Sequence, residues 1–93
     1  MAKNYGNMGN VYKIRGDLDK ALEYYGKAMR IFKEMKNVIK AARGLVNIGD
    51  ILVSKNRKDS AIDYYLEAQE LAIDSPPLFK FINKKTNELL GIK

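Results

Sequence analysis

A set of polar side chains recurs at helical spacing and could bind a ligand through charge and hydrogen bonds. It comprises Lys3, Asn7 and Asn10 and, 40 positions later, Arg43, Asn47 and Asp50. Steps of four and three residues place each trio on one face of a helix. An Asn amide both donates and accepts hydrogen bonds, and Lys or Arg adds positive charge. The chemistry these residues predict is recognition of a bound molecule.

Catalysis and metal binding have much weaker support in the sequence. The chain has no His and no Cys, so the commonest general base, the commonest metal ligand and any thiolate are missing. Carboxylates along one straight helix diverge and do not form a cage for a cation, so we interpret the acidic row of residues 59–70 as a solvated face. No nucleophile, base and oxyanion donor can be combined, so we expect no enzyme, no cofactor and no metal site.

The sequence pattern of the elements that position these residues occurs twice in the chain. Residues 2–35 and 42–75 align with eight identities, which are Ala2/Ala42, Asn7/Asn47, Gly9/Gly49, Asp19/Asp59, Ala21/Ala61, Tyr24/Tyr64, Tyr25/Tyr65 and Ala28/Ala68. A fixed period of this size is typical of stacked repeats, in which each unit buries its apolar face against its neighbours. Such a stack presents an extended surface for binding.

Each repeat is predicted to form two helices. The apolar stripe of the first helix is Tyr5, Met8, Val11 and Tyr12, echoed by Leu45, Ile48, Ile51 and Leu52. Gly16 and Asn56 suit the left-handed conformation that ends a helix, and Asp17 suits an N-cap. The second helices carry stripes that bury Tyr25 and Tyr65. We expect helices near 2–15, 18–35, 38–55 and 58–73, with no strand.

A fifth helix is predicted near residues 77–90. Ser75 precedes two prolines, which is typical of a helix start. One side is apolar, with Leu78, Phe79, Ile82, Leu89 and Leu90, whereas the other carries Lys80, Asn83, Lys84, Asn87 and Glu88. That polarity suits a helix that caps the last repeat. Residues 1–93 are therefore expected to form one domain, with repeat 1 at about 2–36, repeat 2 at about 37–75 and a capping helix at about 76–91.

These residues resemble the tetratricopeptide repeat family. Its first-helix pattern appears as Tyr5, Met8-Gly9 and Tyr12, and more loosely as Leu45, Ile48-Gly49 and Leu52. Its second-helix pattern appears as Ala21, Tyr25 and Ala28, then Ala61, Tyr65 and Ala68. The period of 40 exceeds the family's usual 34, and the proline after the second helix is absent. The chain thus looks like the longer-repeat branch found in kinesin light chains, spindle-orientation adaptors and bacterial signalling-peptide receptors.

The resemblance implies an all-α, right-handed α-solenoid of two helix-turn-helix repeats plus a C-terminal capping helix, with first helices lining a concave groove. In long-repeat members, the Asn before the apolar-Gly pair contacts a bound peptide, and Asn7 and Asn47 match it. We therefore expect a peptide-binding site made of Lys3, Asn7, Asn10, Arg43, Asn47 and Asp50. Residues 1–15 carry three basic and no acidic side chains, and residues 36–55 carry four basic and one acidic. The expected partner is a protein or peptide of acidic character.

Alternative functions remain open from the sequence. The chain could self-assemble into a homo-oligomer or swap helices, because the first repeat leaves Tyr5, Val11 and Ile31 without a preceding unit. A sequence pI near 9.6 raises nucleic-acid binding as a lesser alternative, but the acidic second helix of repeat 2 interrupts a basic surface. A carboxylate clamp of the chaperone-binding type would lack the basic residue where Gly6 stands. The absence of Cys and of long apolar segments favours a cytoplasmic adaptor with no membrane partner.

Overall fold

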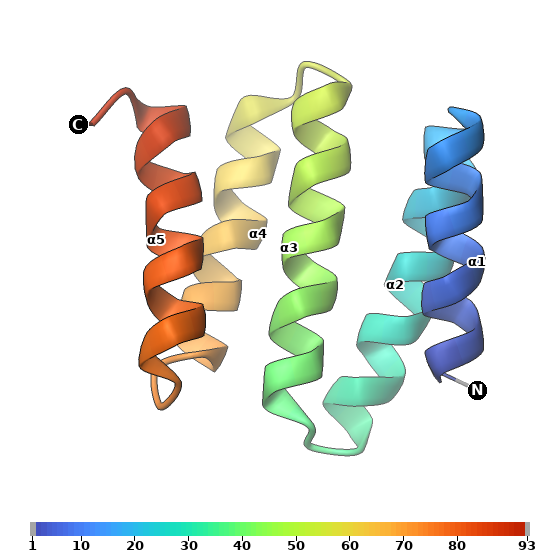
Figure 1. Ribbon diagram of the computed structural model, residues 1–93, viewed down its shortest axis with the longest axis horizontal. Helices are drawn as coiled ribbons and strands as arrows, with labels where there is room; N and C mark the ends of the chain where they lie inside the picture. The colour runs from blue at the N-terminus through green and yellow to red at the C-terminus, as the bar shows by residue number, and fades with distance from the viewer. Residues whose placement is uncertain (1, 93) are drawn as a thin grey trace.

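Five helices connected by short turns make up residues 2–92, the part of the chain that the computed structural model describes. They are α1 (Ala2–Arg15), α2 (Leu18–Glu34), α3 (Val38–Ser54), α4 (Lys58–Leu71) and α5 (Pro76–Leu90). Figure 1 shows them side by side as an antiparallel row from N to C. The predicted helices are confirmed, with ends that differ by at most two residues. No helix within residues 2–92 is both long and apolar enough to cross a bilayer.

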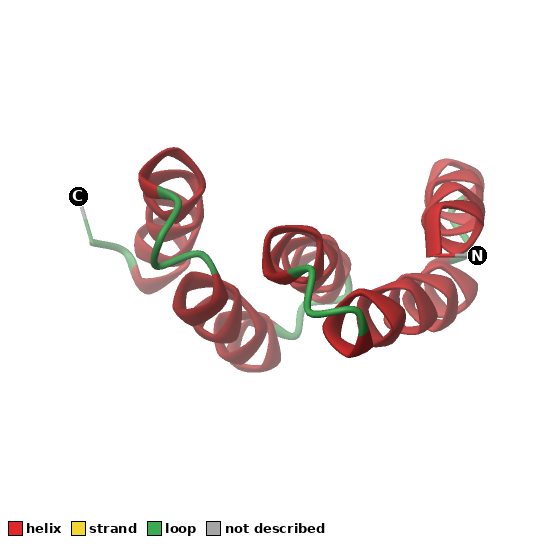
Figure 2. Ribbon diagram, turned by 90° about the horizontal axis from the view of Figure 1, so that it is seen from below, coloured by secondary structure: helices red, strands yellow, loops and turns green. Residues whose placement is uncertain are grey.

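The helices form two curved layers. Seen end-on, α1, α3 and α5 lie on one side and α2 and α4 on the other, and the two ends of the row bend toward the first side (Figure 2). The smallest extent of the molecule is 17 Å, which fits two helices of about 10 Å diameter across the layers. Within residues 2–92, extensive packing joins only helices consecutive in sequence. This arrangement is a helical solenoid, with α1, α3 and α5 on its concave face.

Three of the turns are built alike, and two of them were predicted. Gly16 and Asn56 have the left-handed φ angles of 84° and 61° that their residue types favour. Lys36 adopts the same conformation at 58°, which its residue type does not predict, because Lys is unfavourable there. The side chain of Asp17 accepts a hydrogen bond from the Lys20 amide at 3.2 Å, as expected of an N-cap. Ser75 stands at the N-cap of α5, but its side chain makes no capping hydrogen bond.

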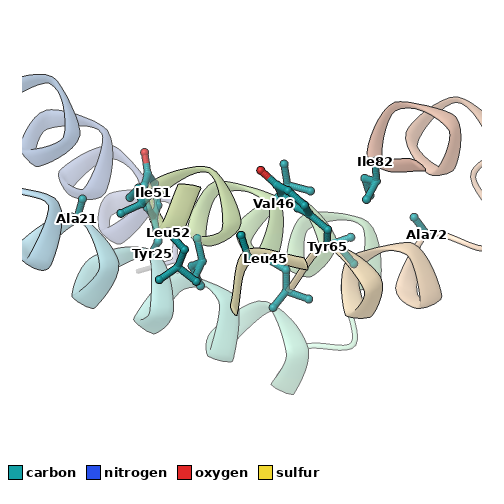
Figure 3. Close-up of a cluster of buried hydrophobic side chains, with 13 residues drawn as sticks. Ala21, Tyr25, Leu45, Val46, Ile51, Leu52, Tyr65, Ala72 and Ile82 are labelled. Atoms are coloured by element: carbon teal, nitrogen blue, oxygen red, sulfur yellow. The ribbon is translucent and has the colours of Figure 1, made fainter. Parts of the chain in front are cut away.

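The core lies along α3, where the two layers meet. The predicted α3 stripe is confirmed, because Leu45, Ile48, Ile51 and Leu52 are all buried. They pack with residues of α2 and α4 and with Ile82 of α5, as Figure 3 shows. The predicted second-helix stripes are also buried at their centres, including Tyr25 and Tyr65. One cluster of apolar side chains therefore joins both repeats and α5.

The predicted stripe on α1 is only partly buried. Met8 and Val11 are 38% and 46% exposed, whereas the equivalent Ile48 and Ile51 of α3 are 5% and 1% exposed. The difference arises because α2 covers α3 on that side, and no helix of residues 2–92 covers α1 in the same way. On α5 the predicted apolar side is wrong at Leu90, which is 52% exposed near the end of the helix.

Candidate functional site

The concave face is hollowed between α1 and α3. The hollow has a volume of about 360 Å³, and its walls carry five of the six predicted site residues, namely Lys3, Asn7, Asn10, Arg43 and Asn47. Its floor is the second layer, where Tyr25, Ala28 and Phe32 of α2 close it. Residues 40 positions apart in the sequence thus face one space, because α1 and α3 occupy equivalent places in the stack (Figure 2).

A second hollow lies between α3 and α5. It has a volume of about 520 Å³ and includes the sixth predicted residue, Asp50, together with Arg43 and Asn47. Its far wall is made by Pro77, Leu78 and Phe81 of α5. Sequence reasoning had assigned α5 to capping alone and missed this wall. Because Arg43 and Asn47 border both hollows, the two spaces form one groove that crosses α3, and we call it the concave groove.

Close approach of the two helices in each repeat fixes where the groove residues stand. A Cβ atom added to Gly9 would lie 2.7 Å from Cδ1 of Tyr25, and one added to Gly49 would lie 2.5 Å from Cε1 of Tyr65. Real Cβ atoms do not tolerate such distances, so each Gly makes room for one tyrosine ring.

Two of the predicted ligand-binding groups are already hydrogen-bonded within the protein. The hydroxyl of Tyr25 donates to Oδ1 of Asn10, and the hydroxyl of Tyr65 donates to Oδ1 of Asp50. Burial raises the pKa of both phenols, and at Tyr65 the hydrogen bond to Asp50 raises it further. Asn10 therefore offers mainly its amide NH2 to a ligand, and Asp50 serves partly as an internal acceptor.

The charge of the groove is positive and only partly compensated. Lys85 Nζ donates to Oδ1 of Asp50 at 3.1 Å, which offsets the one acidic group of the groove lining. The other ion pairs found within residues 2–92 are Lys33–Glu67 and Lys55–Asp19, so none includes Lys3, Lys40 or Arg43. All three of these cations line the hollow between α1 and α3.

A curved stack of paired helices with a hollowed concave face defines the class of helical-repeat proteins that act through a surface. The sequence matches the model of the tetratricopeptide repeat family over residues 1–74, and the chain therefore belongs to this family. Tetratricopeptide repeats generally mediate protein–protein interactions and are typically not catalytic. The predicted fold class, an all-α helical-repeat solenoid, is confirmed. The particular groove residues and the chemistry of the partner stay predictions.

Proposed function

We propose that this chain is a non-catalytic adaptor that binds an extended peptide segment of a partner protein in the concave groove. The observation that carries the proposal is the position of Asn47, which stands on the central helix α3 and borders both hollows. An amide at that point can donate to a peptide carbonyl and accept from a peptide N–H.

We propose the cytoplasm as the location of the protein, because the chain has no Cys.

The partner's segment is proposed to be acidic. Lys3, Lys40 and Arg43 face the hollow between α1 and α3. None of them forms an ion pair with an acidic residue of the described chain. Lys40 Nζ lies 5.6 Å from the centroid of the Phe32 ring, a cation–π contact that holds the ammonium group at the floor of the hollow. A carboxylate-bearing peptide would gain charge-assisted hydrogen bonds there and would associate faster at low salt.

A library of random dodecapeptides displayed on phage tests this function directly. Peptides enriched on the protein are synthesised, and binding is followed by nuclear magnetic resonance of the 15N-labelled chain. We expect amide shifts to cluster on the concave side of α1 and α3, and Arg43→Glu to slow association and flatten its salt dependence. Shifts confined to the outer side of α2 and α4, or an unchanged salt dependence in Arg43→Glu, would contradict the proposal.

A second candidate function is self-assembly through the apolar side of α1 that no helix of residues 2–92 covers. The exposed fractions of Met8 and Val11, 38% and 46%, are high for apolar residues whose α3 equivalents are buried. A second copy of the chain could cover them, by end-to-end stacking or by exchange of helices. Tyr5 does not need such cover, because its ring stacks on Tyr24 at 6.1 Å between centroids.

Sedimentation velocity at high micromolar concentration tests this second function. If a second copy covers α1, the wild-type chain should form dimers or larger species, and Val11→Lys should return it to a monomer without loss of helical structure. A monomeric wild-type chain with a melting temperature independent of concentration would rule the assembly out.

A further inference from the structure

The hollow between α3 and α5 differs in chemistry from the rest of the groove. Five of its nine lining residues are apolar, namely Ile39, Val46, Pro77, Leu78 and Phe81. Six of the twelve residues that line the hollow between α1 and α3, in contrast, are amides or cations. The groove is thus more basic between α1 and α3 and more apolar between α3 and α5, and Arg43 and Asn47 stand where the two parts meet.

The position of Phe81 shows how this change arises. The fully buried Ile82 of α5 corresponds to the fully buried Leu45 of α3, so Phe81 corresponds to Gly44. α5 thus presents an aromatic ring at a place where α3 has no side chain. The ring is 52% exposed, although nearby surface positions of the same helix carry Lys80 and Lys84. Phe81 adjoins the other apolar residues of the hollow, and a contiguous exposed apolar patch marks a binding site, whereas a single exposed apolar residue does not.

Neighbouring side chains hold the Phe81 ring in place. Lys85 Nζ lies 5.2 Å from the ring centroid and donates to Oδ1 of Asp50 at 3.1 Å. Asp50 in turn accepts from the hydroxyl of Tyr65, whose ring is buried against Gly49. This chain of contacts runs from the core to the ring and favours one orientation of the ring before any ligand arrives. A wall ordered in advance loses less entropy on binding than a mobile one.

The same contacts decide the charge beside the apolar wall. Asp50 and Lys85 compensate each other, so Arg43 remains as the uncompensated charge at the border of the hollow. An apolar side chain placed against Phe81 would therefore have a cation within reach. An extended peptide advances about 3.3 Å per residue, so an acidic residue within roughly three positions of that side chain could meet Arg43.

We infer that the hollow between α3 and α5 is a pocket for one large apolar side chain of the partner, such as Leu or Phe, flanked closely by Asp or Glu. This inference rests on the proposed peptide-binding function and specifies the ligand of the same groove. It gives α5 a role in recognition in addition to covering repeat 2. The occupant is an acidic peptide with one apolar anchor.

The test uses peptides enriched from the random dodecapeptide library on the wild-type chain. We expect them to carry a large apolar residue with Asp or Glu within about three positions. Phe81→Ala should weaken the binding of such a peptide by about 10- to 100-fold, because most of the burial of the peptide's apolar side chain is lost. The matched control is Leu90→Ala, because Leu90 is equally exposed at 52% on the same helix and lies outside the hollow.

A double-mutant cycle separates the possible outcomes. Replacing the peptide's apolar anchor by Ala should weaken binding to the wild-type chain by a similar factor, and should have little further effect on Phe81→Ala. If binding depends on Asn47 but is indifferent to Phe81→Ala, the apolar pocket is refuted and the peptide-binding function stands. If no enriched peptide is sensitive to either Asn47→Ala or Phe81→Ala, both the function and the pocket are refuted.

Discussion

Replacing Gly49 by Ala should destabilise the protein, although the substitution favours the helix. In a helix interior Ala is about 1 kcal/mol better than Gly. The new Cβ atom, however, would lie 2.5 Å from Cε1 and 2.9 Å from Cδ1 of Tyr65. This ring is 3% exposed and its hydroxyl is bonded to Asp50, so it has little freedom to move away. Overpacking of this kind costs about 1 to 3 kcal/mol, which leaves a net loss of up to about 2 kcal/mol.

Gly26→Ala is the matched control for this prediction. Gly26 also lies inside a helix, but an added Cβ atom would meet nothing within 4 Å. Only the helix preference then acts, so the variant should gain up to about 1 kcal/mol. Urea denaturation followed by circular dichroism at 222 nm measures both. In a domain of this size, 1 kcal/mol corresponds to about 4 to 8 °C in melting temperature. Stabilisation of both variants alike would refute the close packing of Gly49 on Tyr65.

Further predictions concern turns and titrating groups. Lys36→Gly should raise the free energy of unfolding by about 0.5 to 1 kcal/mol in urea denaturation, because φ at Lys36 is 58°. Burial raises the pKa of Tyr25 and of Tyr65, so the folded state binds their protons more tightly than the unfolded state does. The stability that results is present below pH 10 and is lost as pH rises further. Absorbance at 295 nm should show these two phenols ionising at higher pH in the folded chain than in the unfolded chain. The hydrogen bond from Lys55 lowers the pKa of Asp19, so the stability that this ion pair contributes is present above pH 4 and is lost in acid. In Lys55→Gln the pKa of Asp19, followed by nuclear magnetic resonance, should move back toward its ordinary value.

The helices could be predicted because the types of single residues mark where several of them end. Gly16 and Asn56 mark two turns by residue type, and apolar periodicity marks the helices between them. Lys36 gives no such sign by its residue type, but Asn37 after it caps α3 and accepts a hydrogen bond from the Lys40 amide at 3.3 Å. Burial of the α1 stripe was overestimated. Periodicity shows which face of a helix is apolar, but not whether another helix covers it.

The site was predictable where the repeat itself indicates it. A 40-residue period places Asn7 and Asn47 at equivalent points, and the structure brings both to the groove. The side-chain hydrogen bonds of Asn10 and Asp50 could not be predicted from the sequence, because each is made by a tyrosine 15 positions away on the next helix. Phe81 was missed because we treated α5 as a cap.

Comparing Asn47→Ala with Asn87→Ala tests the central claim most directly. Both residues are Asn within helices, but only Asn47 borders the groove, whereas Asn87 lies among Lys80, Asn83 and Lys84 on another side of α5. Fluorescence anisotropy with a peptide enriched from the dodecapeptide library gives the affinities. Asn47→Ala should keep the wild-type melting temperature within about 2 °C and weaken binding by about 1 to 3 kcal/mol, and Asn87→Ala should change neither. A variant Asn47→Ala that melts much earlier, while its folded fraction binds the peptide at full strength, would contradict the claim.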